Sequence, residues 1–321
     1  MTMARPSAPL VAARFLKIEH NLFSLPVIFA GTLLAWRAVV EGVIVAPVGD
    51  TGVAGAPTPA RIGWILAAGV GARATAMALN RIIDRKIDAA NPRTAARELP
   101  AGALTLRAAW GIAAAGLALY LLAAAAISPA CLMLSPIPLV VFTGYPYLKR
   151  VTPLCHFGVG AALALAPLGG WLAAGPRTLG ELAEAFHGGV PIGAVAPVVP
   201  ALLLALFTFL WVAGFDVIYA TLDEAFDRAH GIRSLPASLG RARALGVAAA
   251  LHIGAVAALA ALWRVAFAGA LAPLPFLVVV AALLALEHRS AHNVDLAFFK
   301  LNVVVGVVVF AYVAAGVWAR G

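Results

Sequence analysis

Charged residues are scarce in this chain. Only 12% of its 321 residues are Asp, Glu, Lys or Arg, while 63% are apolar. Soluble domains carry roughly a quarter charged and about half apolar residues. A soluble globule of this size would lack the polar surface that covers a core, whereas a bilayer accepts apolar side chains on the outside as well. The composition therefore excludes an ordinary soluble domain and predicts a polytopic membrane protein.

Cysteine is also rare, and cysteine and histidine form no metal-binding pattern. Cys131 and Cys155 lie in or beside apolar runs and match no metal or disulfide spacing. We interpret His156, His252 and His288 as core or interfacial residues, because none has ligand spacing with Cys or Asp. The net charge of +9 does not indicate nucleic-acid binding, since the basic residues do not interleave with aromatic ones.

Long apolar runs dominate the rest of the chain. Nine of them can cross a bilayer, which takes about 20 helical residues. They are residues 22–42, 62–82, 104–126, 128–147, 154–174, 194–215, 243–263, 266–286 and 298–318. We expect one all-α transmembrane domain over residues 1–321.

The loops between these runs differ sharply in Lys and Arg. Seventeen basic residues fall on one side of the predicted spans and five on the other, with Arg73 inside a span. Short loops rich in Lys and Arg stay in the cytoplasm. We therefore expect a cytoplasmic N-terminus and an external C-terminus in the plasma (inner) membrane.

Acidic residues gather in two of the predicted cytoplasmic segments. The first continues the second span without glycine or proline and holds Asn80, Asp84 and Asp88. Residues at i, i+4 and i+8 of a helix lie along one face, so these three form a polar column. Like charges at this spacing repel, which predicts a positive group between them. Taken alone, the segment is also consistent with a solvated helix end.

The second acidic segment ends the sixth span. Asp223 and Asp227 repeat the four-residue spacing, and Asp216 precedes them on nearly the same helical face. Mg²⁺ usually takes one or two carboxylates and completes its shell with water and substrate phosphates. Charged groups at membrane depth are costly, which favours a function. Two such segments predict a Mg²⁺ site formed by Asp84 and Asp88 with Asp223 and Asp227.

Basic residues follow both acidic segments. Arg97 comes after the first, and Lys149 and Arg150 end the fourth span. A metal ion surrounded by such groups suits a diphosphate, because Arg binds phosphate oxygens in a bidentate way. Arg93 and Arg228 are equally consistent with anchors that set the membrane topology.

One further Arg lies inside the second span. Arg73 is seven residues before Asn80, on the same helical face but two turns deeper. An unpaired Arg at that depth is costly, so we expect it to face the bundle interior. Structural contact and binding of an acceptor substrate are both open roles for it.

Four separated motifs resemble, in the same order, those of the UbiA-like intramembrane aromatic prenyltransferases. They are residues 80–88, 91–102, 145–150, and 216–227 followed by 231–234. The nine-span architecture of that family agrees with the hydropathy pattern. The resemblance covers nearly the whole chain. One departure is Arg81, because many members have Asp at this position.

The resemblance implies a fold and a mechanism. It implies a UbiA-like bundle whose central cavity opens to the cytoplasmic side. Mg²⁺ ions held by the two aspartate motifs would bind the diphosphate of a polyprenyl donor, and its ionisation would give an allylic cation that an aromatic ring attacks. Asn80 and Asp216 would contribute to substrate binding, and Tyr145 would help to position the acceptor. The cations Arg97, Lys149 and Arg150 would face the diphosphate or an acceptor carboxylate.

Residues 15–26 resemble the subgroup of 4-hydroxybenzoate polyprenyltransferases and their relatives in the futalosine route to menaquinone. We therefore predict Mg²⁺-dependent transfer of a polyprenyl group to an aromatic acid in ubiquinone or menaquinone biosynthesis. Within the superfamily, dihydroxynaphthoate, homogentisate, haem or chlorin acceptors are alternatives. A cation-coupled transporter is an alternative from another class, although its site would be expected near the membrane midplane.

Overall fold

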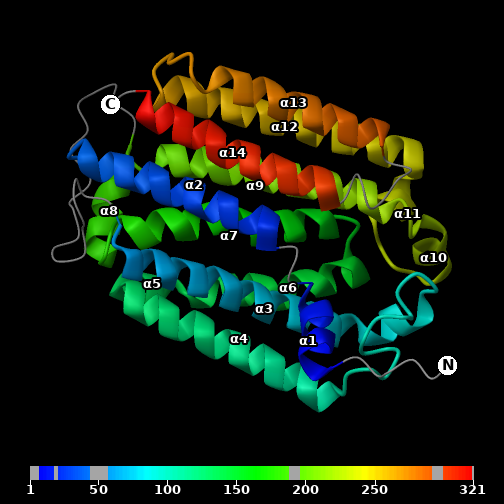
Figure 1. Ribbon diagram of the computed structural model, residues 1–321. Coiled ribbons are helices and arrows are strands. Elements are labelled where there is room, and N and C mark those ends of the chain that lie inside the picture. Colours follow the sequence, from blue (N-terminus) through cyan, green and yellow to red (C-terminus); the bar gives the residue numbers. More distant parts are fainter. Residues whose placement is uncertain (1–6, 18–20, 44–56, 188–195, 291–298, 320–321) are drawn as a thin grey trace.

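A computed structural model describes residues 7–17, 21–43, 57–187, 196–290 and 299–319. Its regular elements are α-helices, and the long ones run side by side along one direction (Figure 1). They are α1 Ala8–Leu16, α2 Asn21–Val40, α3 Pro59–Ala90, α4 Leu106–Ile127, α5 Pro129–Leu134, α6 Pro136–Val151, α7 Cys155–Ala174, α8 Leu179–His187, α9 Val199–Ala220, α10 Glu224–Ala229, α11 Leu235–Leu239, α12 Arg241–Ala266, α13 Leu274–Arg289 and α14 Leu301–Trp318.

Eight spans in the described part of the chain are long and apolar enough to cross a membrane. They are α2, α3, α4, α5 with α6, α7, α9, α12 and α14. The protein is therefore an integral membrane protein, as its composition predicts. The predicted count of nine is not confirmed, because α13 has 16 residues and rises only about 24 Å against a hydrocarbon core of about 30 Å. This helix nonetheless runs between the same two ends of the bundle as α12 and α14 (Figure 1).

Small residues let the helix backbones approach closely. A Cβ atom on Gly31 of α2 would lie 2.0 Å from the carbonyl oxygen of Pro167, and one on Gly170 of α7 would lie 2.0 Å from that of Ile28. Membrane helices often pack through such residues, since lipid offers no hydrophobic force to drive them together. Helices α2 and α7 therefore pack closely against each other, and both line the interior of the helix bundle.

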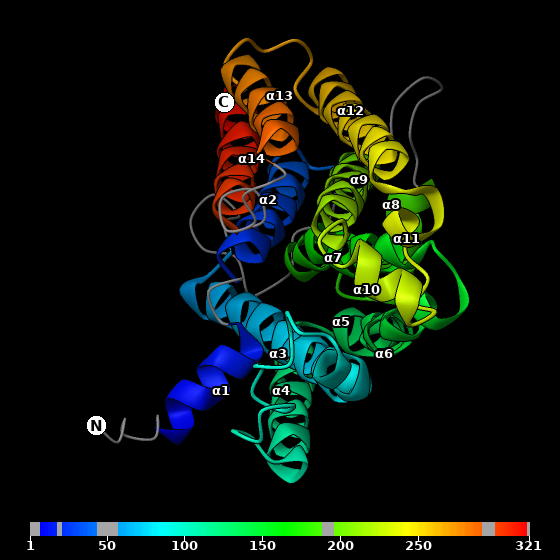
Figure 2. The same cartoon turned by 90° about the vertical axis from the view of Figure 1, so that its right-hand side faces the viewer.

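The short helices α10 and α11 mark one end of the bundle, and α8 lies at the other (Figure 1). The acidic end of α3 lies near α10, whereas α14 finishes at the end where α8 lies (Figures 1 and 2). We call the end with α10 and α11 the carboxylate end. Both predicted acidic segments meet there, although more than a hundred residues separate them in the sequence.

The distribution of basic residues makes the membrane topology testable. Reporter fusions after Gly102 and Gly240, both at the carboxylate end, should report a cytoplasmic location. Fusions after Gly175 and at the C-terminus should report the opposite side. A cytoplasmic C-terminus would show that α13 does not cross the membrane and would contradict the nine-span prediction.

Candidate active site

A cavity of about 220 Å³ at the carboxylate end collects the predicted acidic residues. Its lining includes all five predicted Asp side chains, two Asn side chains and several cations. The polar residues that line it include Asn80, Asp84, Asp88, Asn91, Arg93, Arg97, Tyr145, Lys149, His156, Asp216, Tyr219, Asp223, Asp227 and Ser234. We call it the carboxylate cavity. Both acidic segments, which the sequence analysis joins in one Mg²⁺ site, line this cavity.

The first acidic segment is helical, as its spacing predicts, and continues α3 to Ala90. Asn80 donates a hydrogen bond from Nδ2 to Oδ2 of Asp84 at 3.3 Å, one turn along the same face. Asp84 is only 2% exposed. The expected positive group is Lys149 of α6, whose Nζ lies 2.6 Å from Oδ2 of Asp84. Arg97 supplies a second one, with Nη1 at 2.8 Å from Oδ1 of Asp88.

The second acidic segment is not one continuous helix, which corrects the sequence prediction. Helix α9 ends at Ala220, and Asp223 is the N-cap of α10. The backbone N–H groups of residues 221, 222 and 223 each bond to the carbonyl three residues earlier, which tightens the last turn. The turn separates Asp216 from Asp223, but both still line the carboxylate cavity.

Asp223 is held by residues from the loop after α3. Arg93 donates to both of its carboxylate oxygens, and Asn91 donates from Nδ2 to Oδ1 at 2.8 Å. Burial opposes ionisation of Asp223, but these hydrogen bonds outweigh it and hold the pKa of the carboxyl below its ordinary value. The Arg93 guanidinium also lies 4.8 Å from the ring centroid of Tyr219. Arg93 is therefore part of the site and not merely a topology anchor.

Asp227 is in a different environment. Burial raises the pKa of its carboxyl above the ordinary value, opposed by a hydrogen bond that Ser234 donates from Oγ at 2.8 Å. The same hydroxyl accepts from the N–H of Ala237 and so caps α11. Asn91 and Ser234 lie within the motifs at residues 91–102 and 231–234, but the sequence analysis assigned neither a role in the site, although Asn before Pro and Ser before Leu-Pro are recognisable helix-boundary signals.

The donor set of the carboxylate cavity fits a hard divalent cation. Five carboxylates and two side-chain amides line one space, and oxygen ligands are those that Mg²⁺ prefers. Within the described residues, no three Asp, Glu, His or Cys side chains converge into a preformed metal cluster. Mg²⁺ does not require one, because it retains water and takes substrate phosphates as ligands. The strongest candidates for Mg²⁺ ligands are the side chains of Asp84, Asp88, Asp223 and Asp227.

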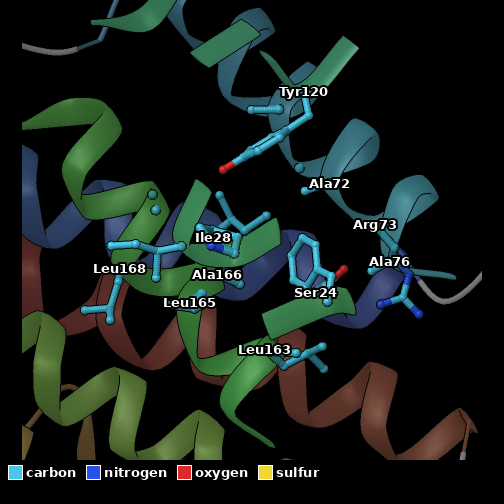
Figure 3. Close-up of a pocket in the computed structure, with 18 of the residues that line it drawn as sticks. Ser24, Ile28, Ala72, Arg73, Ala76, Tyr120, Leu163, Leu165, Ala166 and Leu168 are labelled. Atoms are coloured by element: carbon cyan, nitrogen blue, oxygen red, sulfur yellow. The ribbon is translucent and has the colours of Figure 1, made fainter. Parts of the chain in front are cut away.

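A larger and mainly apolar cavity of about 970 Å³ adjoins the carboxylate cavity and extends between α2, α3, α4 and α7. We call it the apolar cavity. Tyr120 points its hydroxyl into this space, and Ile28 and Leu168 face it from α2 and α7 (Figure 3). At its far end it reaches Leu182 and Phe186 of α8. Its size and lining suit a long hydrocarbon chain.

Arg73 faces the apolar cavity, as the sequence predicts for an Arg at this depth. Its guanidinium lies 4.9 Å from the ring centroid of Phe23, near Ser24 (Figure 3). Tyr145 lines both cavities close to where they meet. A cation, a hydroxyl and aromatic rings therefore surround the inner side of the junction.

Arg150 differs from its prediction because it lines neither cavity. Its Nη2 donates to the carbonyl of Ile83 at 2.9 Å and lies 3.3 Å from Oδ1 of Asp84. Its guanidinium lies 4.9 Å from the ring centroid of Tyr147. Arg150 therefore pairs with the other oxygen of Asp84 from the one that Lys149 contacts.

Two other basic residues also lie away from the carboxylate cavity. Arg81, the departure from the family pattern, is paired with Glu98 at 3.3 Å and packs near the Phe15 ring. It ties the loop after α3 and the helix α1 to the same side of α3. Arg228 pairs with Glu224 at 2.8 Å on the surface of α10, where its side chain is 60% exposed.

His156 departs from the sequence prediction of an ordinary core histidine. Its Nδ1 lies 2.7 Å from Oδ2 of Asp216, and its Nε2 accepts a hydrogen bond from the N–H of Leu235 at 3.2 Å. No sequence spacing signals this contact, because α7, α9 and α11 bring the three residues together only in the folded protein.

Comparisons with known proteins agree with this architecture. The profile of the UbiA prenyltransferase family matches residues 24–304. A 4-hydroxybenzoate octaprenyltransferase of Salmonella paratyphi B is 29% identical over 270 residues, which cover 79% of this chain and 83% of that protein. A polyprenyl transferase of Arthrobotrys oligospora is 32% identical over 158 residues, and this chain spans only 38% of its length.

Solved structures give the same result. A UbiA homologue from Aeropyrum pernix K1 in its apo form is 36% identical, with a TM-score of 0.75 over 92% of this chain and 98% of that one. A UbiA homologue from Archaeoglobus fulgidus bound to GPP and Mg²⁺ has a TM-score of 0.59 over 94% of this chain and 99% of that one. At 18% identity, the second likeness concerns the fold alone.

Proposed function

This chain belongs to the UbiA prenyltransferase family and is a polyprenyltransferase, and we propose that it transfers the polyprenyl group of a polyprenyl diphosphate to an aromatic acid such as 4-hydroxybenzoate. The reaction would serve ubiquinone or menaquinone biosynthesis in the plasma membrane. The observation that carries the proposal is the pair of adjoining cavities, one rich in carboxylates and cations and the other apolar.

The two cavities match the two halves of a polyprenyl diphosphate. The carboxylate cavity holds Lys149, Arg93 and Arg97, which suit the phosphate oxygens, and Asn80 adds an amide. The isoprenoid tail fits the apolar cavity. When bound by the Asp residues, Mg²⁺ would neutralise the charge of the leaving diphosphate. The apolar lining also excludes water, which would otherwise hydrolyse an allylic cation.

Arg73 is the residue that we assign to the acceptor carboxylate. It lines the apolar cavity, whereas Arg150, which the resemblance also offers for an acceptor carboxylate, lines neither cavity. A guanidinium in a water-poor site binds a carboxylate strongly and in a fixed orientation. Tyr145, also at the junction, would position the aromatic ring of the acceptor.

Replacing Arg73 with Ala should remove the enzyme's preference for 4-hydroxybenzoate over its methyl ester. With donor saturating, wild type should use 4-hydroxybenzoate much better than its methyl ester, because only the acid offers a charge to Arg73. Arg73→Ala should raise the KM for the acid while the donor KM changes little, and Arg150→Ala is the matched control that keeps the preference. Equal use of acid and ester by wild type, or loss of donor affinity alone in Arg73→Ala, would contradict the assignment.

The acceptor class is tested by supplying labelled polyprenyl diphosphate together with single acceptors. We expect product with 4-hydroxybenzoate and little or none with homogentisate, haem or chlorin. Preference for homogentisate, haem or a chlorin over 4-hydroxybenzoate would overturn the proposed substrate while leaving the family membership intact.

A further inference from the structure

The junction of the two cavities is the place where the reacting atoms must meet, since the diphosphate and the tail lie on opposite sides of it. Six described residues line both cavities, and Asp216 is the one carboxylate among them. They are Asn80, Arg97, Tyr145, Val159, Asp216 and Tyr219. The hydroxyl of Tyr219 already accepts a hydrogen bond from Arg93. Asp216 is therefore the carboxylate that the described junction offers as a base.

Asp216 differs from the other carboxylates of the site in its partner. Asp84, Asp88 and Asp223 each contact a Lys or Arg side chain within 4.0 Å. Among the described residues, Asp216 makes its one ion-pair-range contact with His156. Within the part of the chain that the structure describes, no Lys or Arg side chain pairs with Asp216.

The contacts of His156 show how it acts on Asp216. The backbone N–H of Leu235 donates to Nε2, which must therefore carry a lone pair and not a hydrogen. The imidazole hydrogen is then on Nδ1 and points at Oδ2 of Asp216 at 2.7 Å. His156 is 2% exposed, so it has no freedom to turn. The imidazole thus holds Oδ2 of Asp216, while Oδ1 accepts no hydrogen bond from the described residues.

We propose that Asp216 is the base that takes the ring proton of the acceptor, and that His156 is the residue that positions it. The inference rests on the proposed function. The bond between donor C1 and the diphosphate oxygen breaks, and its electron pair leaves with the diphosphate. A ring carbon ortho to the hydroxyl then bonds to C1, which gives a cationic ring. The C–H electrons at that carbon return to the ring, and the proton goes to Oδ1 of Asp216.

The base is tested with 4-hydroxybenzoate that carries deuterium at both carbons ortho to the hydroxyl. In wild type, proton loss follows the slow formation of the carbon–carbon bond, so kcat should not change with deuterium. In Asp216→Asn we expect kcat to fall roughly 100-fold, as is typical for loss of a general base, and proton loss to become slow. A primary isotope effect on kcat should then appear, while the acceptor KM changes little.

His156 offers a matched pair of variants. His156→Asn places an amide N–H near the position of Nδ1, so it keeps the donor to Asp216 and loses the acceptor for Leu235. His156→Gln places its amide oxygen near Nε2, so it keeps the bond to Leu235 and loses the donor to Asp216. If His156 positions the base, the Gln variant should show the lower kcat and the isotope effect, and the Asn variant should recover most activity. Equal defects, or a better Gln variant, would show that His156 only supports α11.

Binding of a non-reactive polyprenyl thiolodiphosphate, measured in the same preparations, reports whether each variant is folded. If Asp216→Asn does not fold, the two His156 variants decide the question. An Asp216→Asn enzyme that shows no isotope effect and only a higher acceptor KM would overturn the proposal, because the diphosphate or water would then take the proton. Absence of any prenylated aromatic acid from wild type would instead contradict the proposed function.

Discussion

Replacing any one of Asp84, Asp88, Asp223 and Asp227 with Asn should lower kcat roughly 10²- to 10³-fold, as loss of one preorganised electrostatic group does in other enzymes. Each residue lines the carboxylate cavity, and each carries charge that balances metal and cations there. Asn keeps the size of the side chain, so the loss should come from charge and not from packing. The measurement is steady-state turnover with both substrates saturating, at fixed free Mg²⁺.

Glu41→Gln is the control for these four variants. Glu41 is an exposed carboxylate in an i,i+4 pair with Arg37, just beyond the end of α2, and it lines neither cavity. Its turnover should equal that of wild type. Near-normal turnover in two or more of the Asp variants, with normal amounts of protein in the membrane, would contradict the metal assignment.

Replacing Lys149 with Met should also abolish most turnover, with a loss of roughly 10²-fold or more that follows from removing a fixed charge at the leaving group. Its Nζ lies 2.6 Å from Oδ2 of Asp84, and it lines the cavity that suits the diphosphate. The stem of Met is nearly the same length, so helix α6 keeps its packing. We expect both a higher donor KM and a lower kcat, measured with acceptor saturating.

Two variants show whether the charge of Lys149 is what matters. Lys149→Arg keeps a cation and should recover part of the activity, whereas Arg228→Ala removes a surface cation outside both cavities and should have no effect. Similar losses in Lys149→Arg and Lys149→Met, together with weaker protein expression, would mean that Lys149 serves mainly to neutralise buried Asp84. In that case the diphosphate assignment of this residue would be wrong.

Most of the fold follows from hydropathy, because a bilayer imposes long apolar helices and leaves few alternatives. Helices α2, α7 and α14 begin and end within a few residues of the predicted spans. Helix α13 differs from its predicted span, because it begins eight residues later. A turn that contains Ala268 with a positive φ precedes it. Hydropathy averages over such a turn and therefore could not locate it.

The carboxylate column on α3 was predictable because it depends only on helical periodicity. The break between α9 and α10 was not, because it is made by backbone hydrogen bonds within an otherwise helix-compatible segment. Contacts between segments that are distant in the sequence could not be predicted either. Arg93 reaches Asp223 across 130 positions and His156 reaches Asp216 across 60, and no local pattern encodes either pair.

We expect the carboxylate cavity, when loaded with a divalent metal, to transfer a polyprenyl group to an aromatic acid. The most direct test uses purified protein in liposomes with labelled geranylgeranyl diphosphate and 4-hydroxybenzoate, in Mg²⁺ or in excess EDTA. We expect the label in a ring-prenylated acid only when Mg²⁺ and the acid are both present. The same product in EDTA, or label that appears only as free polyprenol while the acid stays unmodified, would contradict the account.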